Sequence, residues 1–327
     1  MKKIAFGIFL LAGIATVHAQ TVKDPNIAAL LEAEKFIDAF KQAEIKLKAN
    51  PDDIDGLTAL AMSAANQKIP EASRESALKT LEACAEKLNA AVCHWGVGGI
   101  AGSLALEGGM LKAMRVAPKI KSSFEKSLQV DPLFSAARTG LIQYYLMAPG
   151  IAGGSASKAM EVASAEQTRQ PEYAKVFRAM VHNHNEAWAK ADEQLAGIAL
   201  GNDTVLRDNA QAQWLTLAFG WLKDKQALKA KSVFERLQKD RPSSAYPVYG
   251  LGRVQTDLGQ ADDAIALLTR SATLKDADQL PIDYRMGIAL QLKGDKVGAK
   301  TALTKSLQSK VMSSGAKKDA QKRIDDL

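Results

Sequence analysis

The chain has 327 residues, of which 47% are hydrophobic, and a formal net charge of +7. This is the composition of a globular protein, large enough for one big domain or two ordinary ones. Aromatic residues make up only 6% of the chain, whereas 55 residues are alanine. Alanine has the highest helix propensity, and β-sheet proteins favour β-branched and aromatic residues, so the composition favours packed helices and excludes sandwiches, barrels and disorder. The lysines are mixed with acidic residues, and we therefore expect no nucleic-acid partner.

The first nineteen residues, 1–19, are predicted to be a signal peptide. Two lysines precede an apolar stretch at residues 4–17, and the small residue Ala19 comes directly before Gln20. A charged start, an apolar middle and a small-residue end are typical of secretory signals. The alternative is an uncleaved anchor helix, but the apolar stretch is short for a membrane span. We expect a mature chain without a membrane-spanning segment that is periplasmic, or secreted.

The two cysteines of the chain are Cys84 and Cys93. An even number of cysteines in an oxidising compartment suggests pairing. At this spacing a disulfide would join the end of one helix to the start of the next, across a turn near Asn89. The alternative is two small buried thiols. A metal site is not expected, because only His94 lies nearby and zinc takes four ligands.

Residues 211–310 contain three consecutive segments that share one pattern. The first carries it most fully, at Trp214, Leu217, Ala218, Trp221, Ala230, Phe234 and Pro242. The next two keep its small and apolar places, at Leu251, Gly252, Gly259, Ala264 and Leu268, and at Met286, Gly287, Leu290, Gly294, Ala299 and Leu303. The order and spacing of these residues resemble the tetratricopeptide repeat, a 34-residue unit of two helices.

The resemblance implies an all-α fold, a tetratricopeptide-like α-solenoid of stacked antiparallel helix pairs over residues 20–327. The clearest repeats are 211–244, 245–279 and 280–310, and looser, longer units fill residues 54–200. In each unit a small residue lets the first helix, helix A, approach the second, helix B. One pair cannot bury its apolar face alone, so pairs must stack. We expect about eight units and a polar final helix as a cap.

The longer units differ from the pattern in their loops. One begins near Trp95 and has roughly ten extra residues, with Gly108 and Gly109 as its turn. Another breaks at residues 148–154 and resumes at Ser155, a helix N-cap. That break is either a long turn, which we favour, or a loop whose N–H groups bind an anion. Residues 171–200 look like a degenerate pair.

These longer units and the segment 144–155 also resemble exported bacterial tetratricopeptide-like proteins, among them the T components associated with TRAP-type transporters. The resemblance implies an accessory protein of a small-molecule transporter, with a cavity or pore near Trp95 and Tyr144.

No arrangement of residues in the sequence points to catalysis. His182 and His184 stand close together, but two neighbouring imidazoles are too few for a metal site, and polar turn residues are the favoured interpretation. The glycines between Gly96 and Gly109 do not follow a strand, which argues against a dinucleotide loop. We therefore expect no enzyme, no metal and no cofactor.

The tetratricopeptide resemblance implies that helix A lines a binding groove. Its places in the three clear repeats include Phe219, Tyr246, Tyr249, Arg253, Tyr284 and Gln291. Tyrosine and arginine are residue types that dominate binding energy, although the tyrosines could instead pack between units. The sequence thus predicts an exported, non-catalytic scaffold that binds a peptide or protein partner in this groove. The transporter accessory protein is the alternative, and the oligomeric state stays open.

Overall fold

The computed structural model describes residues 22–327, so the predicted signal peptide lies outside the described part. Within that part the chain forms seventeen α-helices and two short 3₁₀ helices. An isolated bridge between Ser244 and Lys275 is the sole β-pairing among these residues. The predicted all-α fold is confirmed. No helix between residues 22 and 327 combines the length and apolarity needed to cross a membrane.

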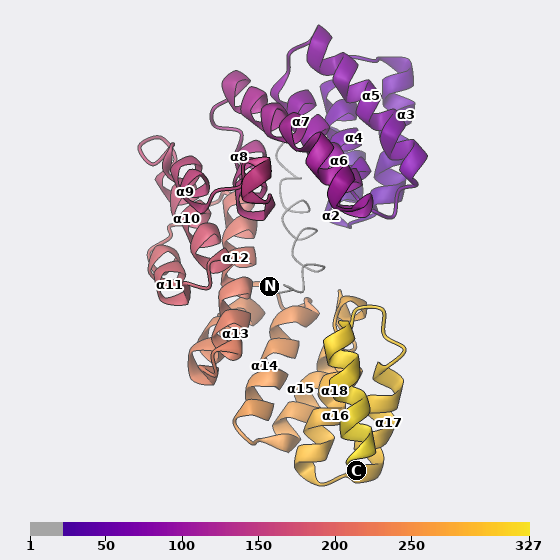
Figure 1. Ribbon diagram of the computed structural model, residues 1–327, viewed down its shortest axis with the longest axis vertical. Coiled ribbons are helices and arrows are strands. Elements are labelled where there is room, and N and C mark those ends of the chain that lie inside the picture. The colour runs from indigo at the N-terminus through magenta and orange to yellow at the C-terminus, as the bar shows by residue number, and fades with distance from the viewer. Residues whose placement is uncertain (1–21) are drawn as a thin grey trace. The chain divides into compact units, whose positions relative to one another are not determined.

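The chain divides into two compact units, and their described parts are residues 22–212 and 213–327. The boundary falls inside one long helix, α12 (Thr204–Lys223). The α-helices before it, labelled in Figure 1, are α2 (Pro25–Glu32), α3 (Phe36–Ala49), α4 (Ile54–Ala64), α5 (Glu71–Lys87), α6 (Ala91–Glu107), α7 (Gly109–Val130), α8 (Ser135–Met147), α9 (Ala156–Ser164), α10 (Pro171–His184) and α11 (Trp188–Ala196). The short 3₁₀ helix η1 (Gly150–Ala152) lies between α8 and α9. Those after it are α13 (Ala227–Asp240), α14 (Ala245–Asp257), α15 (Ala261–Ser271), η2 (Ala277–Gln279), α16 (Ile282–Lys293), α17 (Lys296–Ser306) and α18 (Ser314–Asp325).

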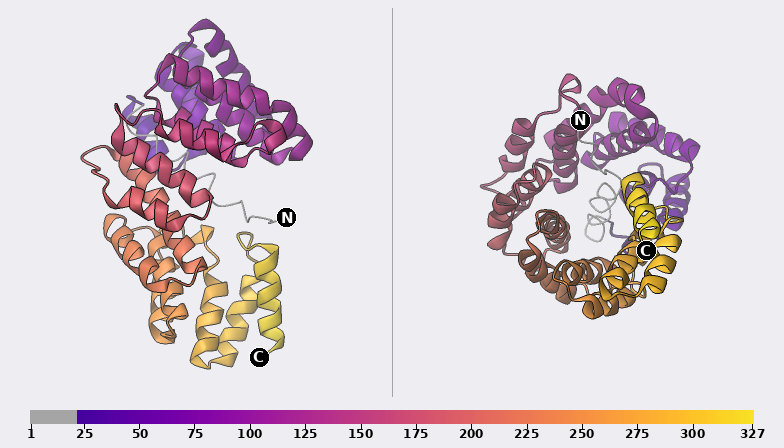
Figure 2. Two further views of the ribbon diagram at one scale, coloured as in Figure 1. Left: turned by 60° about the vertical axis from the view of Figure 1, so that its left-hand side comes forward. Right: turned by 60° about the horizontal axis from the view of Figure 1, so that its bottom comes forward.

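In chain order the helices from α2 to α17 group into eight pairs, and α18 follows them. Consecutive helices pack against each other in both units, for example α8 with α9 and α14 with α15. In the C-terminal unit α16, α17 and α18, yellow in Figure 2, lie side by side in both views. Residues 171–200, which looked degenerate in sequence, contain α10 and α11, and these also pack as a pair.

Close helix packing within a pair depends on a small residue on helix A and a large residue sixteen positions later on helix B. A Cβ atom on Gly252 would lie 2.8 Å from Cγ of Leu268, and one on Gly287 would lie 2.6 Å from Cγ of Leu303. Real side chains do not approach so closely, so glycine is needed at these places. This is the physical basis of the repeat pattern.

The pair α6 and α7 is longer than the others, with 17 and 22 residues, whereas α14 and α15 have 13 and 11. Gly98 on α6 faces Phe124 on α7, and a Cβ atom there would lie 2.8 Å from the ring. These two residues are ten positions further apart than Gly252 and Leu268. The roughly ten extra residues expected from the sequence therefore lengthen both helices. As predicted, the turn lies at Gly108 and Gly109, the latter with φ +78°.

Cys84 and Cys93 are joined in a disulfide, with Cα atoms 5.8 Å apart. Cys84 lies in the last turn of α5 and Cys93 in the first turn of α6. Asn89 stands between these helices with a positive φ of 48°, and its side-chain oxygen lies 2.8 Å from Nε2 of His94. The bridge thus has the place that the sequence predicted, across the turn near Asn89.

The segment from Pro149 to Gly154 is a turn, as favoured from the sequence. The N–H groups of Ala152, Gly153 and Gly154 donate to carbonyl groups within the segment. The next N–H, of Ser155, donates to the Tyr145 carbonyl at 2.8 Å. These donors are already used and are not free to bind an anion. Ser155 caps α9, accepting a hydrogen bond from the N–H of Lys158.

Candidate functional site

The six residues predicted for the helix-A groove all lie in the C-terminal unit, on α12, α14 and α16. Two of them are not available to a partner, because Tyr249 is 3% exposed and Tyr284 is 9% exposed. The Tyr249 ring packs against Phe219, with the ring centroids 6.2 Å apart. Exposure was therefore the wrong expectation for these two tyrosines. Their rings fill the space between stacked helices, which is the alternative that the sequence left open.

Three of the six predicted residues make hydrogen bonds to neighbouring elements. The Tyr284 hydroxyl donates to Oδ2 of Asp319 at 2.7 Å, and Oε1 of Gln291 accepts from Arg323 at 2.8 Å. Both partners lie on α18, so these bonds hold the final helix against α16. The hydroxyl of the half-buried Tyr246 donates to Oε1 of Gln279 at 2.9 Å.

The remaining predicted residue, Arg253 on α14, lies beside a second arginine, Arg285 on α16. The Arg253 guanidinium carbon is 5.3 Å from the centre of the Phe219 ring, and that of Arg285 is 5.2 Å from the Tyr284 ring. Burial, and then the positive charge of Arg285, lower the pKa of Arg253 to about 10. Among the described residues, neither Nε atom has a hydrogen-bond partner.

Two neighbouring half-buried guanidinium groups form a place where an anion would be stabilised, because a negative charge there would offset the burial and the like charge that disfavour the Arg253 cation. A carboxylate there would accept hydrogen bonds from both arginines, as carboxylates commonly do from guanidinium groups. Arg285 was missed in the sequence because only fixed places of each repeat were considered, and it lies outside them.

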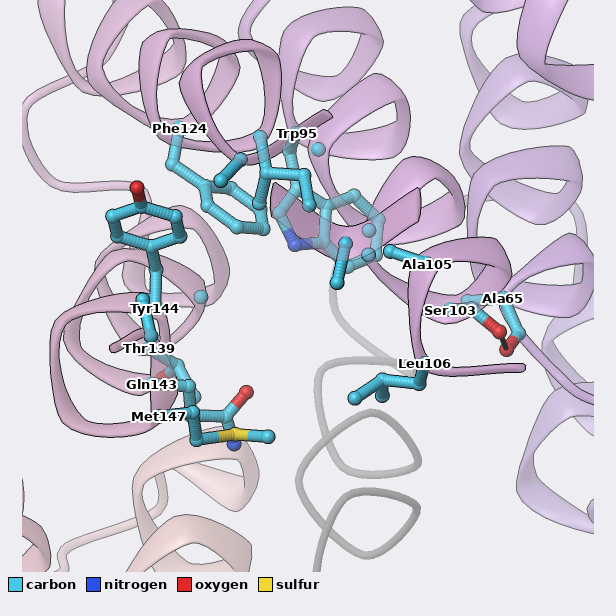
Figure 3. Close-up of a pocket in the computed structure, with 18 of the residues that line it drawn as sticks. Ala65, Trp95, Ser103, Ala105, Leu106, Phe124, Thr139, Gln143, Tyr144 and Met147 are labelled. Atoms are coloured by element: carbon cyan, nitrogen blue, oxygen red, sulfur yellow. Dashed lines mark hydrogen bonds between the residues drawn. The ribbon is translucent and has the colours of Figure 1, made fainter. Parts of the chain in front are cut away.

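The N-terminal unit contains an apolar cavity of about 240 Å³, shown in Figure 3. Its walls come from α4, α6, α7 and α8 and from the turn that follows α8. On α6 the wall includes Gly99 and Gly102, where a Cβ atom would meet nothing within 4 Å. On α7 it includes Met110 and Met114, which are 71% and 37% exposed at the rim.

The extra length of α6 and α7 creates this cavity. The lengthened part of the hairpin carries small residues on α6 and apolar ones on α7, at Met110, Met114 and Ala117, a spacing that places all three on one helix face. Large side chains from a helix partner would fill such a wall in a regular repeat. Here the wall stays open on one side, which leaves a concave apolar surface.

The end of α6 is held in place by Arg74 of α5, which is 2% exposed. Its guanidinium donates to Ser103 at 3.1 Å and to Oε1 of Glu107 at 2.8 Å. Ser103 in turn donates to the Ala65 carbonyl at 2.9 Å. The hydrogen bond from Arg74 lowers the pKa of Glu107, and the bond to Glu107 raises the pKa of Arg74. This network fixes the cavity wall against α4 and α5.

A cavity near Trp95 and Tyr144 was expected from the sequence only under the transporter alternative, and both residues line the cavity of the N-terminal unit. The wall residues on α7 were missed. Two methionines four residues apart in the inserted part of the repeat were the available signal. Among residues 22–327, no group of three or more His, Cys, Asp or Glu side chains could hold a metal ion.

No family model and no curated protein matches the sequence. The crystal structure of the APC/C hetero-tetramer Cut9–Hcn1 matches 94% of this chain, with a TM-score of 0.52 and 18% identity. The structure of the human IFIT1 dimer with m7Gppp-AAAA matches 96% of it, with a TM-score of 0.50 and 14% identity. The Cut9 chain is a tetratricopeptide-repeat protein.

The fold is a tetratricopeptide-repeat solenoid. This chain spans 57% of the Cut9–Hcn1 chain that it matches and 74% of the IFIT1 chain. The predicted resemblance to tetratricopeptide-repeat proteins is thereby confirmed at the level of fold. No comparison supports the resemblance to transporter T components.

Proposed function

We propose that this tetratricopeptide-repeat protein is a non-catalytic scaffold that binds a peptide segment of a protein partner on the helix-A face of α14 and α16. The observation that carries the proposal is the pair Arg253 and Arg285, two neighbouring cations that form no salt bridge among the described residues and feel only weaker attraction from Asp257 and Asp319. The bound segment would therefore contain a carboxylate. Arginine stays protonated at neutral pH and cannot accept a proton from a substrate, which favours binding over catalysis.

We further propose that the protein acts outside the cytoplasm, after removal of residues 1–19. The disulfide between Cys84 and Cys93 supports this location, because disulfides persist in oxidising compartments. Amino-terminal sequencing of the protein from the periplasmic or secreted fraction of its host should give Gln20 as the first residue. The export proposal would be contradicted if the protein in that fraction still began at Met1. It would also be contradicted if the protein were absent from that fraction.

The partner proposal is tested with two double variants that each remove two positive charges. Arg253→Gln/Arg285→Gln alters the candidate site, and Lys239→Gln/Lys300→Gln alters two exposed lysines on the helix-B side. Proteins are captured from the exported fraction with wild type and both variants. We expect the arginine variant to lose a partner that the lysine variant retains.

A synthetic acidic segment of that partner is then titrated by calorimetry. Its affinity should fall by roughly tenfold or more in the arginine variant, because a charge-assisted hydrogen bond contributes about 1.5–3 kcal/mol. Equal capture by all three proteins would contradict the proposal. So would arginine-dependent capture that disappears on treatment with nuclease, because the ligand would then be a nucleic acid.

A further inference from the structure

The cavity of the N-terminal unit contains a hydrogen-bond donor that is not used by the described chain. Trp95 on α6 is 7% exposed, and in Figure 3 its indole nitrogen points into the cavity. Within residues 22–327 this N–H has no hydrogen-bond partner. Although most of the Trp95 side chain is buried, its nitrogen is not among the fully buried atoms without a partner, so the N–H is reached from the cavity. The donor is therefore placed to bind an acceptor that occupies the cavity.

A second unused polar group faces the cavity from α8. Thr139 is 9% exposed, and its hydroxyl has no hydrogen-bond partner in the described chain. Other helical threonines behave differently: Thr58 donates to the Ile54 carbonyl at 2.7 Å, and Thr256 donates to the Gly252 carbonyl at 2.9 Å. The Thr139 hydroxyl is thus available to a ligand.

The cavity has no charged wall. Of its lining residues in the described chain, none is Asp, Glu, Lys, Arg or His. An ionised group placed beside Trp95 and Thr139 would lose hydration and find no opposite charge, which is unfavourable. The ligand that suits this site is therefore uncharged.

The volume of about 240 Å³ sets the size of the ligand. Apolar cavities of about 150 Å³ stay dry and bind benzene, so this one accommodates a larger molecule. Met110 and Met114 lie at its rim, and methionine adapts its shape to different apolar surfaces. Binding pockets for small molecules have this character, mostly apolar with a few placed polar groups.

We infer that the cavity between α6, α7 and α8 binds a neutral apolar small molecule that has an oxygen accepting hydrogen bonds from Trp95 and Thr139. This inference does not depend on the proposed peptide site, which lies in the other unit. A neutral ligand would give the protein a second, chemically distinct binding activity.

Three probes of equal chain length test the chemistry: 1-octanol, octanoate and octylammonium, titrated by calorimetry at pH 7 into Arg253→Gln/Arg285→Gln, so that octanoate cannot bind at the arginine pair of the other unit. Octanol should bind, and the two ions should bind at least tenfold more weakly. Because apolar area is buried, the heat capacity of binding should be negative. Absence of octanol binding, or equal binding of the ions, would overturn the inference.

Two conservative variants test the polar groups. Trp95→Phe and Thr139→Val each remove a hydrogen-bonding group and keep most of the volume. Each should weaken octanol binding by about tenfold, the effect of one hydrogen bond of about 1.4 kcal/mol. In the NMR spectrum, the indole N–H signal of Trp95 is identified by its absence from Trp95→Phe. Octanol should shift that signal in wild type. If a different indole signal shifts, octanol binds elsewhere and the inference fails.

Filling the cavity provides the final test. Gly102→Leu introduces a side chain into open space, so the protein should fold and octanol binding should be lost. Gly197 is an exposed glycine away from the cavity, also with open space around a Cβ atom, and Gly197→Leu is the matched control. Unchanged octanol binding in Gly102→Leu would show that this cavity is not the site.

Discussion

At the scale of single residues, the disulfide between Cys84 and Cys93 closes a short loop. This loop joins the end of one helix pair, at α5, to the start of the next, at α6. A cross-link stabilises a protein mainly by restricting its unfolded chain, and a loop of this length gives about 2.5 kcal/mol. We predict that Cys84→Ala/Cys93→Ala lowers the free energy of unfolding by about that amount, as measured by urea denaturation. Reductant should destabilise wild type to the same extent and leave the double variant unchanged. If reductant has no effect on wild type, the disulfide is not formed in solution.

For Tyr249 and Phe219, the sequence predicted the position on the helix but not the exposure to solvent. Their places on helix A followed from the repeat pattern, and their helices are as predicted. Which side of helix A faces solvent depends on how each pair stacks on the next, and the spacing within one repeat does not contain that information. Tyr249 therefore lies in the core, whereas Arg253, one turn later, remains half-buried at the surface.

At the scale of the helix, α6 contains two adjacent glycines in opposite surroundings. A Cβ atom on Gly98 would lie 2.8 Å from the Phe124 ring, whereas one on Gly99 would meet nothing within 4 Å. We predict that Gly98→Ala destabilises the protein by about 1–3 kcal/mol through overpacking. Gly99→Ala should stabilise it by about 0.5–1 kcal/mol, because alanine restricts the unfolded chain and favours the helix.

Urea denaturation of the two glycine variants and wild type measures both effects in the same helix. Opposite signs for the two neighbours would support close packing of Gly98 on Phe124. A stability change of the same sign in both would mean that helix propensity, and not packing, determines the effect at Gly98.

The helix pair α6 and α7 also marks what the sequence could predict at this scale. The extra residues and the turn at Gly109 were visible as a departure from the repeat length. The lining of the cavity could not be predicted from the sequence. The cavity forms where the lengthened α6–α7 hairpin extends past α4 and α8, and its lining depends on contacts with those two helices. Trp95 and Thr139 are 44 positions apart, and no local pattern links them.

At the scale of the whole molecule, the two candidate sites lie in different units and have opposite chemistry. Arg253 and Arg285 favour an anion, whereas the cavity around Trp95 favours a neutral molecule. Octanoate and octanol are therefore informative in both tests, since a carboxylate suits the arginine pair and an alcohol suits the cavity. Binding of each probe should respond to variants in one unit only.

The stability of the whole protein should decline as the pH falls below about 6.5. Burial lowers the pKa of His94, His182 and His184 in the folded protein, and Lys126 adds to the effect at His94. In the unfolded chain these imidazoles titrate near pH 6.5, so the unfolded state binds protons first as the pH falls. The contribution is fully present above pH 6.5 and is lost below it. Glu107, whose pKa is lowered by Arg74, adds a further loss below about pH 4.5.

Urea denaturation from pH 8 to pH 4 measures this dependence. The free energy of unfolding should change little between pH 8 and pH 7, which is above the pKa of histidine in both states, and then fall steadily below pH 6.5. His182→Gln should make the decline shallower, because that variant removes one half-buried imidazole, whereas Lys300→Gln, an exposed change on α17, should leave the slope unaltered. A stability that is constant from pH 7 to pH 5 would mean that the histidines are hydrated in solution and that the helix pairs around them pack loosely.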